Sequence, residues 1–96
     1  MEIVKTQEGS EVTLELIGEL DTEAAPQLEA EIEKLSEGDS LVLELERLEY
    51  IASSGLRQFV AAHKKLGGKL VLRHVSNNLM GILKTTRLDK RITIEN

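Results

Sequence analysis

Two adjacent serines, Ser53 and Ser54, stand where a strand is expected to end and a helix to begin, and a hydroxyl at such a junction can serve as a nucleophile. A hydrolase elbow requires Gly-x-Ser-x-Gly, but Ile51 and Ala52 precede Ser53, so that motif is absent. His63 follows on the same predicted helix, and ten residues of helix would place it roughly 15 Å from Ser53, beyond the reach of a hydrogen bond. We therefore expect both serines to cap the helix, a role that is compatible with a further function.

No other pattern in the sequence is typical of a catalytic, metal or nucleotide site. His63 and His74 are the only histidines, and they stand on separate predicted elements without a His-x-x-His pair or an acidic coordination loop. Glu44, Glu46 and Glu49 are expected to lie on the wet side and at the end of a strand. The glycine motifs that bind the phosphates of nucleotides, Gly-x-x-x-x-Gly-Lys and Gly-x-Gly-x-x-Gly, do not occur in the sequence. We predict no metal site, no cofactor and no enzymatic activity.

A short motif around Ser40 supplies a second hypothesis. Gly38-Asp39-Ser40-Leu41 resembles the Asp-Ser-Leu attachment site of acyl carrier proteins, in which the serine bears phosphopantetheine. Those carriers are helical bundles, whereas strand-like patterns occur in several segments of this chain. An acyl carrier protein modified at Ser40 stays open as the alternative, and a minor serine hydrolase, with His74 as the remaining base, is the third possibility.

The composition indicates one small globular domain over residues 1–96. Hydrophobic residues make up 41% of the chain and charged residues 30%, with one Phe, one Tyr and no Trp, so aliphatic side chains must form the core. No apolar run approaches the ~18 residues of a membrane span, and the N-terminus lacks the pattern of a signal peptide. The absence of cysteine fits a reducing compartment. We predict a cytoplasmic protein without a membrane partner.

Acidic and basic residues are divided unequally along the chain. Residues 1–52 hold fifteen acidic side chains against three basic ones, whereas residues 53–96 hold nine basic side chains against two acidic ones. The basic half alternates with apolar residues and contains one aromatic side chain, Phe59, so it lacks a platform on which bases could stack. The acidic half would repel phosphates. We expect the two halves to fold together and predict no nucleic-acid partner.

Hydrophobic periodicity predicts the elements that position these residues. A strand-like segment at 1–6, a turn at 7–10 and alternation over 12–16 predict a hairpin. Apolar residues at helical spacing predict helices over about 25–35, 56–66 and 76–83, and strands are expected at 41–45, 69–73 and 91–95. Asp21 or Thr22 is expected to cap the first helix, and Ser76 or Asn77 the third. The predicted order is β-β-α-β-α-β-α-β, an α/β domain with a mixed sheet that is largely parallel after the hairpin.

Motifs at these junctions resemble those of a known family. They are Gly18-Glu19-Leu20-Asp21, the segment Leu48-Glu49-Tyr50-Ile51-Ala52-Ser53-Ser54-Gly55-Leu56, and Gly67-Gly68 before a hydrophobic strand. With this order of elements, nearly the whole chain resembles the STAS domain of bacterial anti-sigma-factor antagonists. The resemblance implies a single STAS-like α/β domain with helices packed against a mixed sheet.

The resemblance also implies a partner switch that regulates transcription. In the family, the unphosphorylated antagonist binds an anti-sigma factor that is also its serine kinase, phosphorylation breaks the complex, and a PP2C-type phosphatase restores it. The first serine of the family's Asp-Ser-Ser-Gly-Leu motif matches Ser53, with Ser54 as the alternative acceptor, and Ala52 replaces the aspartate. The implied partner surface consists of Glu19, Asp21, Ala52, Ser53, Ser54 and Gly55.

The residues after Ser53 predict its geometry. Gly55 permits a tight turn before a helix that begins near Leu56, so the hydroxyl of Ser53 is expected to be exposed at the helix N-terminus. Free backbone N–H groups and the helix dipole at that position tolerate the roughly −1.5 to −2 charges of a phosphate. Modification should therefore leave the fold intact and act on the partner.

Overall fold

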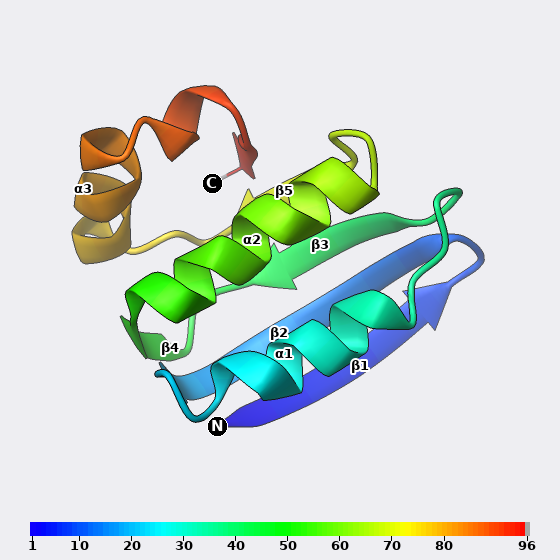
Figure 1. Cartoon of the computed structure of the whole chain (residues 1–96), viewed down its shortest axis with the longest axis horizontal. Coiled ribbons are helices and arrows are strands. Elements are labelled where there is room, and N and C mark those ends of the chain that lie inside the picture. The colour runs from blue at the N-terminus through cyan, green and yellow to red at the C-terminus, as the bar shows by residue number, and fades with distance from the viewer. Residues whose placement is uncertain (96) are drawn as a thin grey trace.

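A β-hairpin forms one edge of a six-stranded mixed sheet (Figure 1). In this computed structural model, which describes residues 1–95, β1 (Glu2–Glu8) runs antiparallel to β2 (Glu11–Leu20). The other strand pairs are parallel, in the order β1-β2-β3-β5-β6 with β4 beside β2. The predicted hairpin and largely parallel sheet are confirmed.

Strands and helices alternate along most of the chain after the hairpin. The remaining strands are β3 (Ser40–Glu44), β4 (Leu48–Ile51), β5 (Leu70–Arg73) and β6 (Thr93–Glu95). The helices are α1 (Ala25–Glu33), α2 (Ser53–Lys65) and α3 (Asn77–Thr85), followed by the short 3-10 helix η1 (Leu88–Lys90). Figure 1 shows α1 and α2 side by side over the sheet, with α3 and η1 on the other side of α2 from α1. The sequence predicted the three α-helices but neither β4 nor η1.

Aliphatic side chains fill the space between the sheet and the helices. Alternate residues of β2, Val12, Leu14 and Leu16, are fully buried, and Phe59 of α2 packs into the same core. Burial of every second residue reflects the side-chain alternation of a strand. Ser76 caps α3 by accepting a hydrogen bond from the N–H of Leu79 at 3.1 Å, which confirms one of the two predicted caps.

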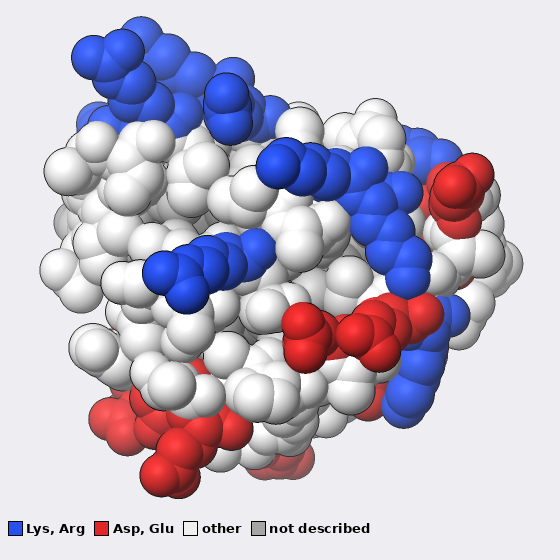
Figure 2. All heavy atoms as spheres, viewed as in Figure 1, with Lys and Arg blue, Asp and Glu red and all other residues white. Residues whose placement is uncertain are grey.

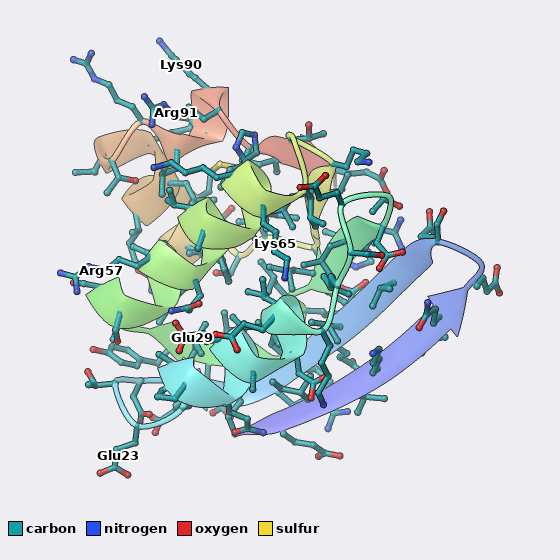
Figure 3. The ribbon with its side chains drawn as sticks, turned by 45° about the vertical axis from the view of Figure 1, so that its right-hand side comes forward. Glu23, Glu29, Arg57, Lys65, Lys90 and Arg91 are labelled. Atoms are coloured by element: carbon teal, nitrogen blue, oxygen red, sulfur yellow. The ribbon has the colours of Figure 1, made fainter. Side chains whose placement is uncertain are left out.

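The basic half of the chain is folded against the acidic half. Lys65 of α2 donates hydrogen bonds to the carbonyls of Ile32 and Glu33, at 3.1 and 3.0 Å, and thereby satisfies carbonyls at the C-terminal end of α1. Figure 3 shows the Lys65 side chain reaching from α2 toward α1. Lys69 donates in the same way to the carbonyl of Glu37 at 2.8 Å. The expectation that the two halves fold together is confirmed.

Some of the charges gather in groups on the surface. Figure 2 shows one group of Lys and Arg over η1 and the adjacent end of α3 and one group of Asp and Glu below the start of α1, while elsewhere on this face basic and acidic side chains lie next to each other. Lys90 of η1 and Arg91, the residue after it, project at one end of the molecule, and Glu23 projects at the other (Figure 3). Within residues 1–95, no helix is both long enough and apolar enough to cross a membrane.

Candidate functional site

β2 changes its neighbour partway along its length, and this change builds the site. Its first half pairs with β3, and its last residues pair with β4 across a register shift between Gly18 and Glu19. Gly18 has φ of 101°, a conformation that favours glycine, and its N–H donates to the carbonyl of Arg47 at 3.1 Å. Leu20 is thereby paired with Ile51 at the end of β4. The residues that follow these two strands consequently emerge next to each other.

The end of β2 and the start of α2 form one continuous surface. The N–H of Ala52 donates to the carbonyl of Leu20 at 2.9 Å. The hydroxyl of Ser54 lies 3.5 Å from the hydroxyl of Thr22, although the two residues are 32 positions apart in the sequence. The structure therefore brings together the segments 19–22 and 52–55, which contain all the residues that the sequence assigned to a partner surface.

Helix α2 begins at Ser53, earlier than the start predicted near Leu56. Its N-cap is Ala52, with the extended backbone angles φ −91° and ψ 167°, and no side chain accepts a hydrogen bond there. The expectation that Ser53 and Ser54 cap the helix is therefore wrong, because both lie within its first turn. Ser53 is exposed and Ser54 is half-buried. Among residues 1–95, no side chain supplies an acceptor at the N-cap of α2, and Ser53 is exposed beside these N–H groups.

Gly55 sets the distance between α2 and the sheet. It is buried, and a Cβ at this position would lie 2.7 Å from Cγ and 2.8 Å from Cδ2 of Leu20, and 3.1 Å from Cγ1 of Ile51. The expectation of a tight turn at Gly55 is wrong, since the residue lies inside the helix without a left-handed backbone. Its missing side chain instead lets the first turn of α2 approach the ends of β2 and β4.

Asp21 stabilises the loop between β2 and α1, which lies beside the start of α2. Its carboxylate Oδ1 accepts a hydrogen bond from the N–H of Ala24 at 2.9 Å, and its carbonyl accepts from Ala25 at 2.9 Å. The expectation that Asp21 or Thr22 caps α1 is wrong, because the N-cap of α1 is Ala24 and has no side-chain cap. The bond from Ala24 to Asp21 instead stabilises the turn that leads into α1. Glu19 is exposed and pairs in register with Tyr50 of β4.

The sequence did not identify three neighbours of the site. Tyr50 is 52% exposed, which is unusual for a large aromatic residue, and Thr22 contacts Ser54. Arg57 lies one helical turn after Ser53, and Figure 3 shows its side chain projecting away from α2. A hollow of about 350 Å³ beside the serine is lined by Ser53, Leu56, Arg57, Val60, Thr86 and Leu88. Two features of the sequence could have indicated these neighbours: Tyr50 is the single tyrosine of the chain, and Arg57 stands four residues, about one helical turn, after Ser53.

The structure overturns the alternative at Ser40. Ser40 is the first residue of β3, and its N–H donates to the carbonyl of Ser10 at 2.8 Å, so it lies at the opposite end of β2 from Asp21. A mixed six-stranded sheet is incompatible with the helical bundle of an acyl carrier protein. The strand-like patterns in the sequence, which argued against an acyl carrier protein, therefore predicted the fold correctly.

Ester hydrolysis is not expected from this arrangement. His63 lies ten residues after Ser53 on the same helix, and the ring of His74 contacts Glu44. Ser53 thus lacks the adjacent base that activates a serine nucleophile. We expect no turnover of p-nitrophenyl acetate above the buffer rate, measured by absorbance with Ser53→Ala as the control. Turnover by the wild type that disappears in Ser53→Ala would contradict this prediction.

Comparisons with known proteins agree with the fold. The family model described as Mlab, STAS domain matches residues 3–95. An anti-sigma-B factor antagonist from Listeria monocytogenes is 31% identical over 98 residues, which cover 97% of this chain and 86% of the relative. An anti-sigma factor antagonist from Mycobacterium paratuberculosis superimposes with a TM-score of 0.84 at 24% identity, over 97% of this chain and 83% of the other. Phosphorylated SpoIIAA from Bacillus gives a TM-score of 0.76 at 20% identity, over 99% and 92% of the two chains.

Proposed function

The chain belongs to the STAS domain family, and on that premise we propose that it is a non-enzymatic anti-sigma-factor antagonist that acts in the bacterial cytoplasm. The observation that carries the proposal is the exposed hydroxyl of Ser53 at the uncapped N-terminus of α2, beside the loop that holds Asp21. The curated relative from Listeria monocytogenes, which is named as an antagonist of this kind, supports the same function.

The proposed mechanism is a switch in partner binding. The unphosphorylated chain binds an anti-sigma factor that is also its serine kinase, and a PP2C-type phosphatase reverses the modification. A phosphate on Ser53 would add about −1.5 to −2 charges at a helix N-terminus, where the backbone tolerates an anion. Because Ser53 is exposed, the added group would lie outside the core and would change the surface that the partner meets.

Burial favours Ser53 over Ser54 as the acceptor. A kinase must bring the hydroxyl oxygen into line with the transferred phosphoryl group, which requires an accessible side chain. Ser53 is exposed, whereas Ser54 is half-buried and its hydroxyl faces Thr22 at 3.5 Å. The serine that the family motif indicates is therefore also the more accessible one.

The proposed partner surface divides into contact residues and supporting residues. Glu19 and Ser53 are exposed, and Asp21 and Ala52 are partly exposed, so all four are available to a partner. Gly55 is buried against Leu20, and we assign it a supporting role in positioning the first turn of α2.

Asp21→Lys tests the contact surface. We expect it to weaken binding to the anti-sigma factor, recovered by pull-down from the source bacterium and identified by mass spectrometry, by about tenfold or more, because it reverses a charge beside Ser53. The stability cost should be at most ~1 kcal/mol, from the lost hydrogen bond to Ala24. Titration calorimetry measures the affinity.

Two further variants control this experiment. Asp39→Lys makes the same charge change and also removes a turn bond, since Asp39 accepts from the N–H of Ser36 at 3.0 Å, but it lies next to Ser40 at the other end of the molecule. Asp21→Asn keeps an acceptor for Ala24 and removes only the charge. Equal affinities of Asp21→Lys and Asp39→Lys would remove Asp21 from the proposed surface.

A further inference from the structure

Three side chains with metal-binding chemistry converge where β3 and β5 end. Nδ1 of His74 lies 2.6 Å from Oε1 of Glu44 and 3.9 Å from Oε2 of Glu46. One ligand atom from each of the three residues lies within 4.8 Å of the others. The sequence predicted no metal site, but from this geometry we infer that Glu44, Glu46 and His74 form a binding site for a divalent transition-metal ion, with Zn²⁺ as the ion that best fits the ligand set.

The backbone explains why residues so distant in sequence meet here. β3 and β5 are parallel neighbours with Glu44 in register with Arg73, so His74 follows directly beside the two glutamates. Strand alternation would turn His74 to the face opposite Arg73. Instead, His74 has φ of 56°, in the left-handed region, and its N–H donates to the carbonyl of Glu95 at 3.3 Å. This turn ends the alternation and directs the ring toward Glu44.

The imidazole distinguishes this cluster from an ordinary group of surface acids. Zn²⁺ is bound by histidine nitrogen and carboxylate oxygen at about 2.0–2.2 Å, and three protein ligands leave a fourth position for water. Mg²⁺ and Ca²⁺ are hard ions that take oxygen ligands, with water filling the positions that the protein leaves open, so the imidazole nitrogen disfavours both. The nitrogen together with two carboxylates therefore favours a transition-metal ion.

The cluster is accessible, and within residues 1–95 no lysine or arginine forms an ion pair with Glu44 or Glu46. The exposed fractions of the three side chains are 18% for Glu44, 71% for Glu46 and 51% for His74. Arg73, the adjacent basic residue, pairs instead with Glu95 at 2.9 Å. Two ligands of a tetrahedral Zn²⁺ lie roughly 3.3 Å apart, so the close contact between His74 and Glu44 must open slightly to admit the ion.

Calorimetric titration of the full chain with ZnCl₂ tests the site. We expect saturable binding of one ion, and His74→Asn, Glu44→Gln and Glu46→Gln should each lower the affinity by about tenfold or more. Asparagine suits position 74 because it tolerates a left-handed backbone. His63→Asn, which removes the other histidine, on α2, is the matched control and should bind as the wild type does. Circular dichroism confirms that each variant is folded.

Proton NMR of the two imidazole rings gives an independent measurement. Addition of Zn²⁺ should shift or broaden the ring resonances of His74 and leave those of His63 unchanged, whereas the same concentration of Mg²⁺ should shift neither. Wild-type affinity in His74→Asn would overturn the proposal, as would failure of the wild type to bind at about 1 mM Zn²⁺. In either case the contact between His74 and Glu44 would be a hydrogen bond without a role in metal binding. This outcome is independent of the proposed partner switch, whose tests alter other residues.

Discussion

Replacement of Ser53 by Asp is expected to weaken binding to the anti-sigma factor about a thousandfold, which corresponds to about 4 kcal/mol. A surface complementary to a neutral hydroxyl and to the nearby Asp21 would meet a second negative charge, and like charges brought together in an interface cost several kcal/mol. Ser53 is exposed in the first turn of α2, where an acidic side chain is favourable for the helix. The loss should therefore appear in binding and not in stability.

A matched variant separates charge from size. Ser53→Asn has nearly the shape of Ser53→Asp without its charge, so it should bind much more tightly than the aspartate variant. Ser53→Ala should retain binding and block modification. Titration calorimetry gives the affinities, and thermal unfolding checks that all three variants are folded. If Ser53→Asp binds as tightly as the wild type, charge at this position is not what the partner rejects.

Phosphopeptide mapping after incubation with the anti-sigma kinase and ATP locates the modified residue. We expect phosphate on Ser53. Phosphate on Ser54 would move the site by one residue and would require its contact with Thr22 to open. No phosphate on either serine would make the chain a constitutive antagonist, for which the replacement of the family's aspartate by Ala52 gives a reason.

Gly55→Ala is expected to lower the free energy of unfolding by about 1–2 kcal/mol. The new methyl carbon would lie 2.7 Å from Cγ of Leu20, which is fully buried, and 3.1 Å from Cγ1 of Ile51, so at least one neighbour must shift. Overpacking of this kind costs about 1–3 kcal/mol, from which up to about 1 kcal/mol is recovered because alanine favours a helix. For a chain of this size, the Tm should fall by roughly 5–15 °C.

Gly81→Ala is the control, since Gly81 also lies within a helix but has nothing within 4 Å of its Cβ position. It should raise the free energy of unfolding by about 0.5–1 kcal/mol, because only the helix propensity changes. Opposite signs for the two variants would support close packing at Gly55. An increase in stability for Gly55→Ala would show that Leu20 can move aside.

Most of the fold could be predicted because its elements have strong periodicity. The alternation of Val12, Leu14 and Leu16 and the helical spacing around Phe59 each bury one face of an element. β4 was missed because it has only four residues, of which Glu49 and Tyr50 are exposed, so no alternation pointed to a core. η1 has three residues and is too short to show a period.

The sequence predicted which segments lie together at the candidate site, but it did not predict their local geometry. Recognition of the motif around Ser53 identified residues that the structure does bring together. Ser-Ser-Gly has the composition of a helix cap, yet the cap position belongs to Ala52, and only the contact with Leu20 shows why position 55 is glycine. The cluster of Glu44, Glu46 and His74 depends on a left-handed backbone at a histidine, which composition does not reveal.

The switch of β2 from β3 to β4 means that the proposed binding surface forms only when the chain folds. Thr22 and Ser54 meet only when a loop of 32 residues closes, so the surface does not exist in an unfolded chain. A partner that touches both sides of this closure binds the native state alone. By mass action, a partner at 100 times its Kd would add about 2.7 kcal/mol to the stability of the fold. Release of the partner would withdraw that stabilisation, so the free chain would unfold and be degraded more readily than the bound one.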